Sequence, residues 1–243
     1  MVFSSLVFLF LFLPASVLVY FLVPGLKMKN RMLLIFSLVF YAWGEPVYIL
    51  LMLFSILMNY DLGRLMEDDP ARKKRTLVFA VAANLLVLGF YKYAGFAVST
   101  VNSLFGTSFY IREIPLPIGI SFYTFQAMGY IIDLYRGKYK AQRNILDFGL
   151  YISMYFQLIA GPIVRYKDVA EQLEDPDRES AALFNRGAEI FLVGLGKKVL
   201  LANTMGSLWT VLSADPAASG VLGAWLGILV YGLQIYFDFS AYS

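Results

Sequence analysis

The sequence predicts an all-α, polytopic membrane protein with about six to eight membrane helices, some of them short or re-entrant. The 243 residues are 59% hydrophobic and only 15% charged, and the mean hydropathy is +0.66. Soluble domains carry about 25% charged residues, so this chain has too few charged residues for the surface of a typical soluble domain. Apolar segments follow one another along all of residues 1–243, and we therefore expect one membrane domain and no soluble domain.

Eight apolar segments are candidates for membrane helices. They are 2–23, 32–43, 47–60, 76–98, 115–137, 146–164, 188–212 and 221–242. A full crossing needs about 20 residues at about 1.5 Å each, so the second and third segments are too short for one and are expected to be short, steep or partly buried helices in a thinned region. The first segment lacks a basic start and a small-residue cleavage site, which indicates a retained helix, and Pro14 is expected to bend it.

The positions of basic residues predict the orientation of these helices. Clusters of Lys and Arg lie at 27–31, 72–75 and 136–143, whereas the connections 44–46 and 99–113 carry almost no net positive charge. By the positive-inside rule, the three clusters are cytoplasmic and the amino terminus is outside. The run at 72–75 is interpreted as a determinant of topology rather than as a binding site for anionic lipid or an acidic carrier.

The segment 146–164 does not fit a simple crossing. It contains Gln157 and ends in Ala160-Gly161-Pro162, which is a helix stop. A full crossing would also place 165–186 outside and Lys197-Lys198 within the next crossing. We therefore expect a re-entrant or tilted helix that returns to the cytoplasmic side, because irregular backbone at depth must be buried in protein or line a cavity.

Two apolar segments carry polar stripes at helical spacing. Polar side chains that face lipid cost free energy, so each stripe is expected to face protein or water. The two stripes are expected to line one shared hydrated cavity. The alternative for the two glutamines is an interhelical hydrogen bond that serves packing, worth about 0.6 kcal/mol. The candidates on segment 115–137 are Tyr123, Gln126, Tyr130 and Asp133. The candidates on segment 221–242 are Gln234 and Asp238.

Further alternatives concern the charged candidates. Asp133 lies near the expected cytoplasmic end of its helix, where it suits a plain interfacial residue paired with Arg136. Asp238 lies deep in an apolar segment and should be either paired or facing water. Gln157 and Arg165 complete the candidate tunnel lining, and Arg165 is placed at the cytoplasmic mouth, where it suits an anionic acyl donor.

Several motifs in order resemble one family. The block PIGISFYTFQAMGYIIDLYRG at 117–137 resembles the most recognisable segment of bacterial membrane-bound O-acyltransferases, in the branch of alginate O-acetyltransferases and D-alanyl exporters. The other matching motifs are the start MVFSSLVFLFLFLP, LVFYAWGEP at 38–46, LGFYKYAGF at 88–96, IAGPIVRYKD at 159–168, KKVLLAN at 197–203 and QIYFDFSAYS at 234–243.

The resemblance implies an activity and a location. It implies transfer of an acyl group, here an acetyl group, from a cytoplasmic donor, acyl-CoA or acyl-carrier protein, to hydroxyls of an exported polysaccharide or cell-wall polymer. It also implies a multi-pass protein of the bacterial inner membrane, in contact with lipid and with partner export proteins. No bound cofactor is expected.

The resemblance implies that the reactive residues are a His, or sometimes an Asn, in a Trp-rich segment and an invariant His further on, and this sequence contains no His. A hydroxyl acceptor is a poor nucleophile until a general base takes its proton. We therefore expect no catalytic residue here, and we interpret the chain as an amino-terminal half that is truncated before the catalytic His residues and inactive alone.

Two other classes of function stay open at the level of sequence. One is a transporter or flippase for a lipid-linked intermediate, which also uses polar stripes and broken helices at depth. The other is a non-catalytic membrane subunit. The sequence has no Cys, so disulfides and thiolate metal sites are excluded and no metal site is expected. The modest net charge of +3 favours membrane loops over a nucleic-acid partner.

Overall fold

The computed structural model describes all residues except 1–2, 111–114, 159–162, 176–177, 215 and 243, and also leaves out the side chains of 216–219. The described chain is helical and contains no strand. It forms two compact units. The first unit comprises Ala15–Ile159 and Ile163–Asp175, and the second comprises Val2–Pro14 and Pro176–Ser243.

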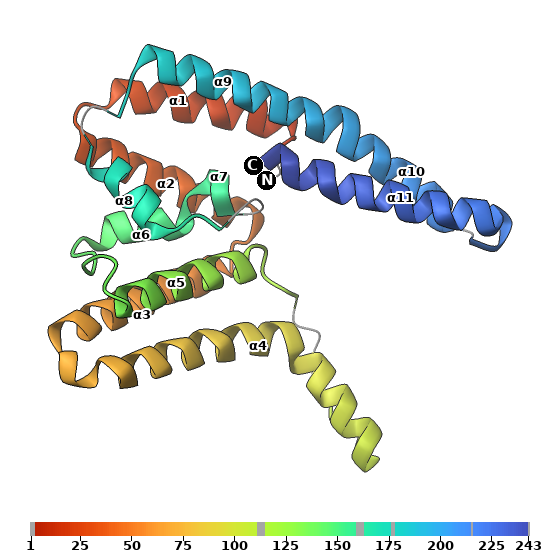
Figure 1. The fold of residues 1–243 in the computed structure, drawn as a ribbon, viewed down its shortest axis with the longest axis horizontal. Coiled ribbons are helices and arrows are strands. Elements are labelled where there is room, and N and C mark those ends of the chain that lie inside the picture. The colour runs from red at the N-terminus through yellow and green to blue at the C-terminus, as the bar shows by residue number, and fades with distance from the viewer. Residues whose placement is uncertain (1–2, 111–114, 159–162, 176–177, 215, 243) are drawn as a thin grey trace. The chain divides into compact units, whose positions relative to one another are not determined.

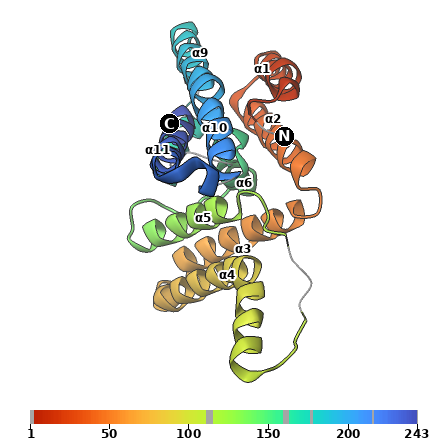
Figure 2. The same cartoon turned by 90° about the vertical axis from the view of Figure 1, so that its right-hand side faces the viewer.

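The first unit is a bundle in which three helices, α3, α4 and α5, lie side by side (Figures 1 and 2). Its core consists mainly of aromatic and aliphatic side chains from these helices and from α6. The helices are α1 (Leu13–Leu22), α2 (Leu26–Gly44), α3 (Ile49–Asp68), the short η2 (Pro70–Arg72), α4 (Lys73–Phe105), α5 (Ile120–Tyr135), α6 (Ile145–Ser153), α7 (Tyr155–Leu158) and α8 (Tyr166–Glu174).

The second and third predicted segments form longer helices than expected. The break at 44–46 is confirmed, since α2 ends at Gly44 and Glu45 has non-helical dihedral angles. However, α2 has 19 residues and α3 has 20, so the alternative of short helices was wrong, whereas the alternative of partly buried helices is confirmed by the buried residues in each. The polar residues at 26–31 and 61–68 continue each helix beyond its apolar part, and hydropathy alone does not show this extension.

The signature segment forms a shorter helix than its apolar run suggests. Helix α5 has only 16 residues because glycines with positive φ lie at both ends, Gly119 at 76° and Gly137 at 72°. A side chain at position 119 is excluded by space as well, since its Cβ would lie 2.8 Å from the carbonyl oxygen of Leu158. The start of α5 is therefore packed directly against the end of α7.

Buried amides join α3 to α4. In α4, Thr76, Ala80, Asn84 and Leu88 form the buried stripe, and no residue of this helix beyond Leu88 is buried. Asn59 and Asn84 donate to each other's side-chain oxygens at 3.1 and 2.8 Å. The carboxy-terminal part of α4 extends away from α3 and α5 (Figure 2).

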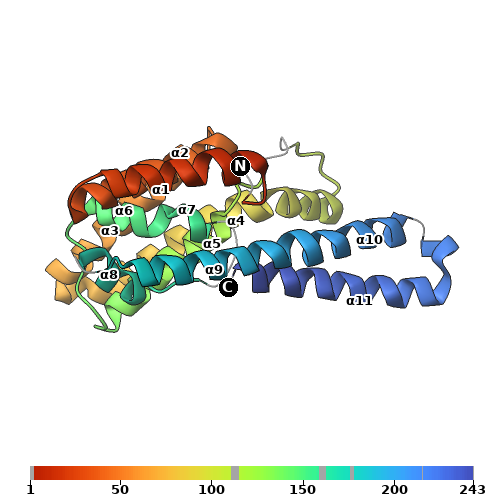
Figure 3. The ribbon, with the colours of Figure 1, turned by 90° about the horizontal axis from the view of Figure 1, so that it is seen from above.

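The second unit contains a helical hairpin, in which α10 and α11 run side by side (Figure 3). The preceding helix also approaches the end of α11 closely, because a Cβ at Gly194 would lie 2.5 Å from the carbonyl oxygen of Ala241. The elements are η1 (Phe8–Phe12), α9 (Ala181–Gly196), η3 (Lys197–Ala202), α10 (Asn203–Ala214) and α11 (Pro216–Tyr242), with a kink at Gly220.

Pro14 acts on the turn that precedes it. Residues 8–12 form a π-helix, in which the amide of Leu13 donates to the carbonyl oxygen of Phe8. Proline has no amide hydrogen and its ring clashes with the carbonyl four residues earlier, so the α-helical ladder cannot continue through this turn. The distortion in the structure is thus a widened turn before Pro14, and the expected bend of the helix stays a prediction.

Three of the described helices are long and apolar enough to cross a membrane. They are Ile49–Asp68, Pro70–Phe105 and Gly220–Tyr242, and Phe8–Leu22 is a shorter apolar helix. The all-α prediction is confirmed for the described residues, whereas the number of six to eight membrane helices stays a prediction.

Candidate functional site

The predicted segment 146–164 contains two helices, α6 and α7, and the break between them leaves a backbone carbonyl oxygen free to accept hydrogen bonds from side chains. Helix α6 ends at Ser153, Met154 has a ψ of 114°, and α7 begins at Tyr155. The amide of Tyr155 donates to the hydroxyl of Ser37 at 3.3 Å instead of continuing the ladder. The carbonyl oxygen of Tyr151 is therefore available to side chains.

Two predicted site residues use this acceptor. The side-chain amides of Gln126 and Gln157 both donate to the carbonyl oxygen of Tyr151, each at 2.8 Å. Gln126 is almost completely buried, so its hydrogen bond is made away from solvent. The interhelical hydrogen bond that was the alternative for Gln126 is thus confirmed, and it fixes α5 against the broken end of α6. The predicted Gly161-Pro162 stop lies outside the described residues.

The side chain of Tyr151 positions the next described segment. Its hydroxyl donates to the carbonyl oxygen of Val164 at 3.1 Å. This contact holds the backbone immediately before Arg165, which is the N-cap residue of α8. Helix α8 is then fixed through its buried residues Tyr166, Val169 and Leu173. Arg165 therefore projects from a backbone that is held on both sides.

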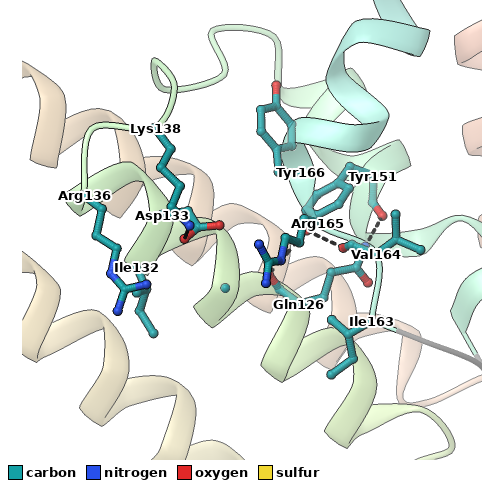
Figure 4. Close-up of a pocket in the computed structure, with 11 residues that line it drawn as sticks. Gln126, Ile132, Asp133, Arg136, Lys138, Tyr151, Ile163, Val164, Arg165 and Tyr166 are labelled. Carbon is teal, nitrogen blue, oxygen red and sulfur yellow. Dashed lines mark hydrogen bonds and ion pairs between the residues drawn. The ribbon is translucent and has the colours of Figure 1, made fainter.

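A pocket of about 340 Å³ lies between α5 and this segment. Figure 4 shows Asp133, Arg136 and Lys138 on one side and Gln126 and Arg165 on the other. The full lining consists of Gln126, Gly129, Ile132, Asp133, Arg136, Lys138, Tyr151, Ile163, Val164, Arg165 and Tyr166. Three of the predicted site residues, Gln126, Asp133 and Arg165, are thus brought together.

The pocket has a net positive charge, because its lining contains three cationic side chains and one carboxylate. The expected pairing of Asp133 with Arg136 was wrong, since its carboxylate accepts from the ammonium of Lys138 at 2.7 Å. Lys138 follows the turn at Gly137, which carries it back over the end of α5. Arg136 and Arg165 have no ion pair with any described residue and are available to an anionic ligand.

Tyr123 and Tyr130 lie on the predicted face of α5 but do not line this pocket. Both are fully buried, whereas Phe125 on the other face is 44% exposed, so the prediction that the polar stripe faces protein is confirmed for these residues. The ring of Tyr130 packs against Phe148 and Tyr166, and its hydroxyl accepts from the amide of Gln142 at 3.0 Å. Tyr130 therefore contacts the pocket only indirectly, by packing against the lining residue Tyr166.

Tyr166 is a lining residue that sequence reasoning missed. Burial raises the pKa of its hydroxyl above the ordinary value for tyrosine, so the hydroxyl stays protonated well above neutral pH. That hydroxyl accepts from the side-chain amide of Gln142 at 2.9 Å. Arg136 and Lys138 were also missed as lining residues, because their cluster was interpreted as a topology signal and Arg136 only as a partner for Asp133.

The other predicted candidates lie in the second unit. Asp238 forms an ion pair with Lys198, and both line a cavity of about 280 Å³ together with Phe239 and Tyr242. Both alternatives for Asp238, pairing and cavity lining, are thus present. Lys198 was missed as its partner. Gln234 packs tightly against α10, where a Cβ at Gly206 would lie 2.9 Å from its amide nitrogen.

The predicted cavity shared by both stripes stays a prediction. Among the described residues, no group of three or more acidic side chains gathers where a metal ion could be held. The first unit is suited to recognition of an anion, because Arg136, Lys138 and Arg165 line one pocket that contains a single carboxylate.

Comparison with known proteins identifies relatives along the whole chain. It is 42% identical over 252 positions to a probable alginate O-acetylase of Pseudomonas aeruginosa, which covers all of this chain and 48% of that protein. It is 31% identical over 276 positions to a peptidoglycan O-acetyltransferase of Helicobacter pylori, again over all of this chain and 52% of that protein. A teichoic acid D-alanyltransferase of Lacticaseibacillus rhamnosus is 28% identical over 136 positions, covering 52% of this chain and 33% of that protein.

No protein-family profile matches the chain, and no solved structure matches it. The chain spans about half the length of the alginate and peptidoglycan O-acetyltransferases that it matches. The match to these enzymes and to the D-alanyltransferase agrees with the motifs described above. The chain therefore belongs to the membrane-bound O-acyltransferase family, in the branch that includes the alginate O-acetylases.

Proposed function

We propose that this chain is part of an enzyme that passes an acetyl group from a cytoplasmic donor to hydroxyls of an exported polysaccharide or cell-wall polymer. The observation that carries the proposal is the 42% identity to a probable alginate O-acetylase over the whole chain. The peptidoglycan O-acetyltransferase extends the same reaction to a cell-wall acceptor. The acceptor class is therefore a hydroxyl-bearing polymer.

The role of the described chain in this reaction is to bind the donor. A donor such as acyl-CoA or an acyl-carrier protein carries phosphate groups, and guanidinium groups bind phosphate oxygens with paired hydrogen bonds. Arg165 and Arg136 are free of ion pairs with described residues and face one pocket. Lys138 can join them by exchanging its partner Asp133 for a phosphate.

The general base is expected to come from outside these 243 residues. The sequence contains no His, the side chain that most often acts as a general base near neutral pH. A polymer hydroxyl needs such a base at the moment of attack. The chain by itself is therefore proposed to be inactive, acting as scaffold and part of the substrate tunnel.

The remaining site residues belong to the same proposal. The stripe of α5 and the stripe of α11, with Gln234 and Asp238, are proposed to line one hydrated tunnel in the complete enzyme. The setting is the bacterial inner membrane, with the amino terminus outside and partner export proteins bringing the polymer. The support for this setting is the three apolar helices and the pattern of basic loops.

A chimera tests this function. The region of the Pseudomonas aeruginosa relative that this chain matches is replaced by the chain, and acetyl groups on secreted alginate are measured. The chimera should acetylate alginate, whereas the chain expressed alone, or purified with acetyl donor and alginate, should give no turnover. A chimera that inserts into the membrane at normal level but leaves alginate unacetylated contradicts the proposal.

The donor pocket is tested in the active chimera. Arg165→Gln should lower acetylation about 10- to 100-fold, because a lost charge-assisted hydrogen bond corresponds to about 1.5–3 kcal/mol. The matched control is Lys167→Gln, which removes an exposed charge two residues away, outside the pocket lining. Equal effects of the two substitutions would show that only the overall charge matters.

A further inference from the structure

The start of α4 carries four cations, and only two of them have a partner among the described residues. Arg72 pairs with Asp69 at 3.3 Å, and the ammonium of Lys73 lies 5.4 Å from the centre of the Tyr135 ring. Lys74 and Arg75 are exposed and form no ion pair with any described residue. The run 72–75 therefore divides into two cations that contact the bundle and two that point away from it.

Helical geometry links these two free cations to an apolar surface. Residues four positions apart lie on the same face of a helix, so Lys74 precedes Val78 and Arg75 precedes Phe79. Val78 and Phe79 are 60% and 62% exposed, and Leu86 continues the same face at 73%. Each cation is therefore followed, one turn further along the helix, by an exposed apolar side chain.

The opposite face of α4 is already used within the bundle. Thr76, Ala80, Asn84 and Leu88 are buried there against the rest of the first unit. The helix itself belongs to the span Pro70–Phe105, which is long and apolar enough to cross a membrane. The exposed face thus has Lys74 and Arg75 at the end of a membrane helix and apolar side chains in the next turn of that helix.

We infer that this surface, formed by Lys74, Arg75, Val78 and Phe79, binds an anionic phospholipid. The two cations contact the headgroup phosphate, and the apolar pair contacts the upper part of the acyl chains. An anionic membrane surface attracts each Lys or Arg near it by about 1 kcal/mol, which is about fivefold per cation. An acidic carrier protein matches the two cations as well, but it does not account for the apolar side chains that follow them on the same face.

Fluorescence quenching by brominated lipids tests this inference directly. Phe79→Trp places a reporter at the surface, and the chain is reconstituted in phosphatidylcholine that contains brominated phosphatidylglycerol or brominated phosphatidylcholine. The signal of the unsubstituted chain, which has three Trp residues, is subtracted. Brominated phosphatidylglycerol should quench the reporter with at least about fivefold higher relative affinity, and this preference should decrease as salt is added.

Two double variants in the Phe79→Trp chain distinguish a site from general charge. Lys74→Gln with Arg75→Gln should abolish the preference for phosphatidylglycerol. Lys140→Gln with Lys167→Gln removes two exposed charges outside α4 and should leave the preference unchanged. Circular dichroism of each variant verifies that it is folded, and native mass spectrometry of the unsubstituted chain should show phosphatidylglycerol retained over phosphatidylcholine.

Three results would overturn the inference. One is equal quenching by the two brominated lipids together with no lipid retained in the mass spectrum. Another is a preference that survives in the Lys74→Gln, Arg75→Gln variant. The third is an absent lipid preference combined with binding of a purified bacterial acyl-carrier protein that depends on Lys74 and Arg75, which would assign the surface to a protein partner.

Discussion

The carbonyl oxygen of Tyr151 accepts from Gln126 and Gln157 at equal distances of 2.8 Å. A carbonyl oxygen has two lone pairs, so either glutamine alone still satisfies this buried acceptor in part. Removing both leaves it without a partner where water has little access, which costs about 1–3 kcal/mol beyond the lost bonds. The contributions of the two glutamines to stability are therefore coupled through the carbonyl oxygen of Tyr151.

This coupling predicts the outcome of a double-mutant cycle. Gln126→Leu and Gln157→Leu should each lower the free energy of unfolding by about 1 kcal/mol, and the double variant should lose more than the sum of the two. The free energy is measured by titrating the chain in detergent micelles with sodium dodecyl sulfate. Strict additivity of the two losses would show that the glutamines do not share this acceptor.

Sequence spacing predicted which face of α5 is buried, but it did not predict what that face contacts. Tyr123, Gln126 and Tyr130 recur at helical spacing, and burying them together follows from the cost of polar groups in lipid. Tyr151 was not identified, because its carbonyl becomes an acceptor only where α6 breaks at Met154. Lys138 was not identified as the partner of Asp133, because the turn at Gly137 brings it back.

At the scale of helices, the amides of Asn59 and Asn84 connect α3 to α4. Each side chain also donates to the backbone carbonyl four residues earlier, Asn59 to Ser55 at 2.9 Å and Asn84 to Ala80 at 2.8 Å. Both residues are buried, so the polar atoms of the pair are satisfied by protein rather than by lipid. The pair therefore joins the two helices at a fixed register.

Replacing both of these amides should destabilise the chain less than replacing one of them. Asn59→Leu should destabilise the chain by about 1–2 kcal/mol, because the amide of Asn84 loses its partner across the interface. Asn59→Leu with Asn84→Leu should recover part of this loss, since two apolar side chains leave no unpaired group. Unfolding by sodium dodecyl sulfate measures all three proteins, and a double variant less stable than the single one would contradict this account.

Helix lengths were predicted less well than helix positions, and the reasons differ from one helix to another. Helix α3 exceeds its apolar run because the residues from Asp61 to Asp68 are good enough helix formers to extend it past the hydrophobic part. Helix α5 falls short of its run because Gly119 interrupts the apolar block. Hydropathy reports where a helix meets lipid, whereas the ends of the helix depend on backbone geometry.

At the scale of the whole molecule, orientation links the pocket to its proposed donor. The cationic pocket is built from the end of α5 and the segment before α8, and Arg136 and Lys138 belong to one of the three basic clusters. If those clusters are cytoplasmic, the pocket opens toward the compartment that holds acyl-CoA and acyl-carrier proteins. The same orientation places Lys74 and Arg75 at the cytoplasmic leaflet, where anionic lipid gives a negative surface potential.

Cysteine labelling tests this orientation, since the chain has no Cys of its own. Lys74→Cys and Lys140→Cys introduce single thiols at exposed positions in two basic clusters, and Ser108→Cys introduces one in the neutral connection. A membrane-impermeant thiol reagent added to intact cells should label position 108 and leave 74 and 140 unlabelled until the membrane is permeabilised, because the positive-inside rule keeps basic loops in the cytoplasm. Labelling of position 74 or 140 in intact cells would show that the predicted topology is wrong. It would also remove the donor pocket from the compartment of its proposed substrate, so this measurement constrains the function as well as the fold.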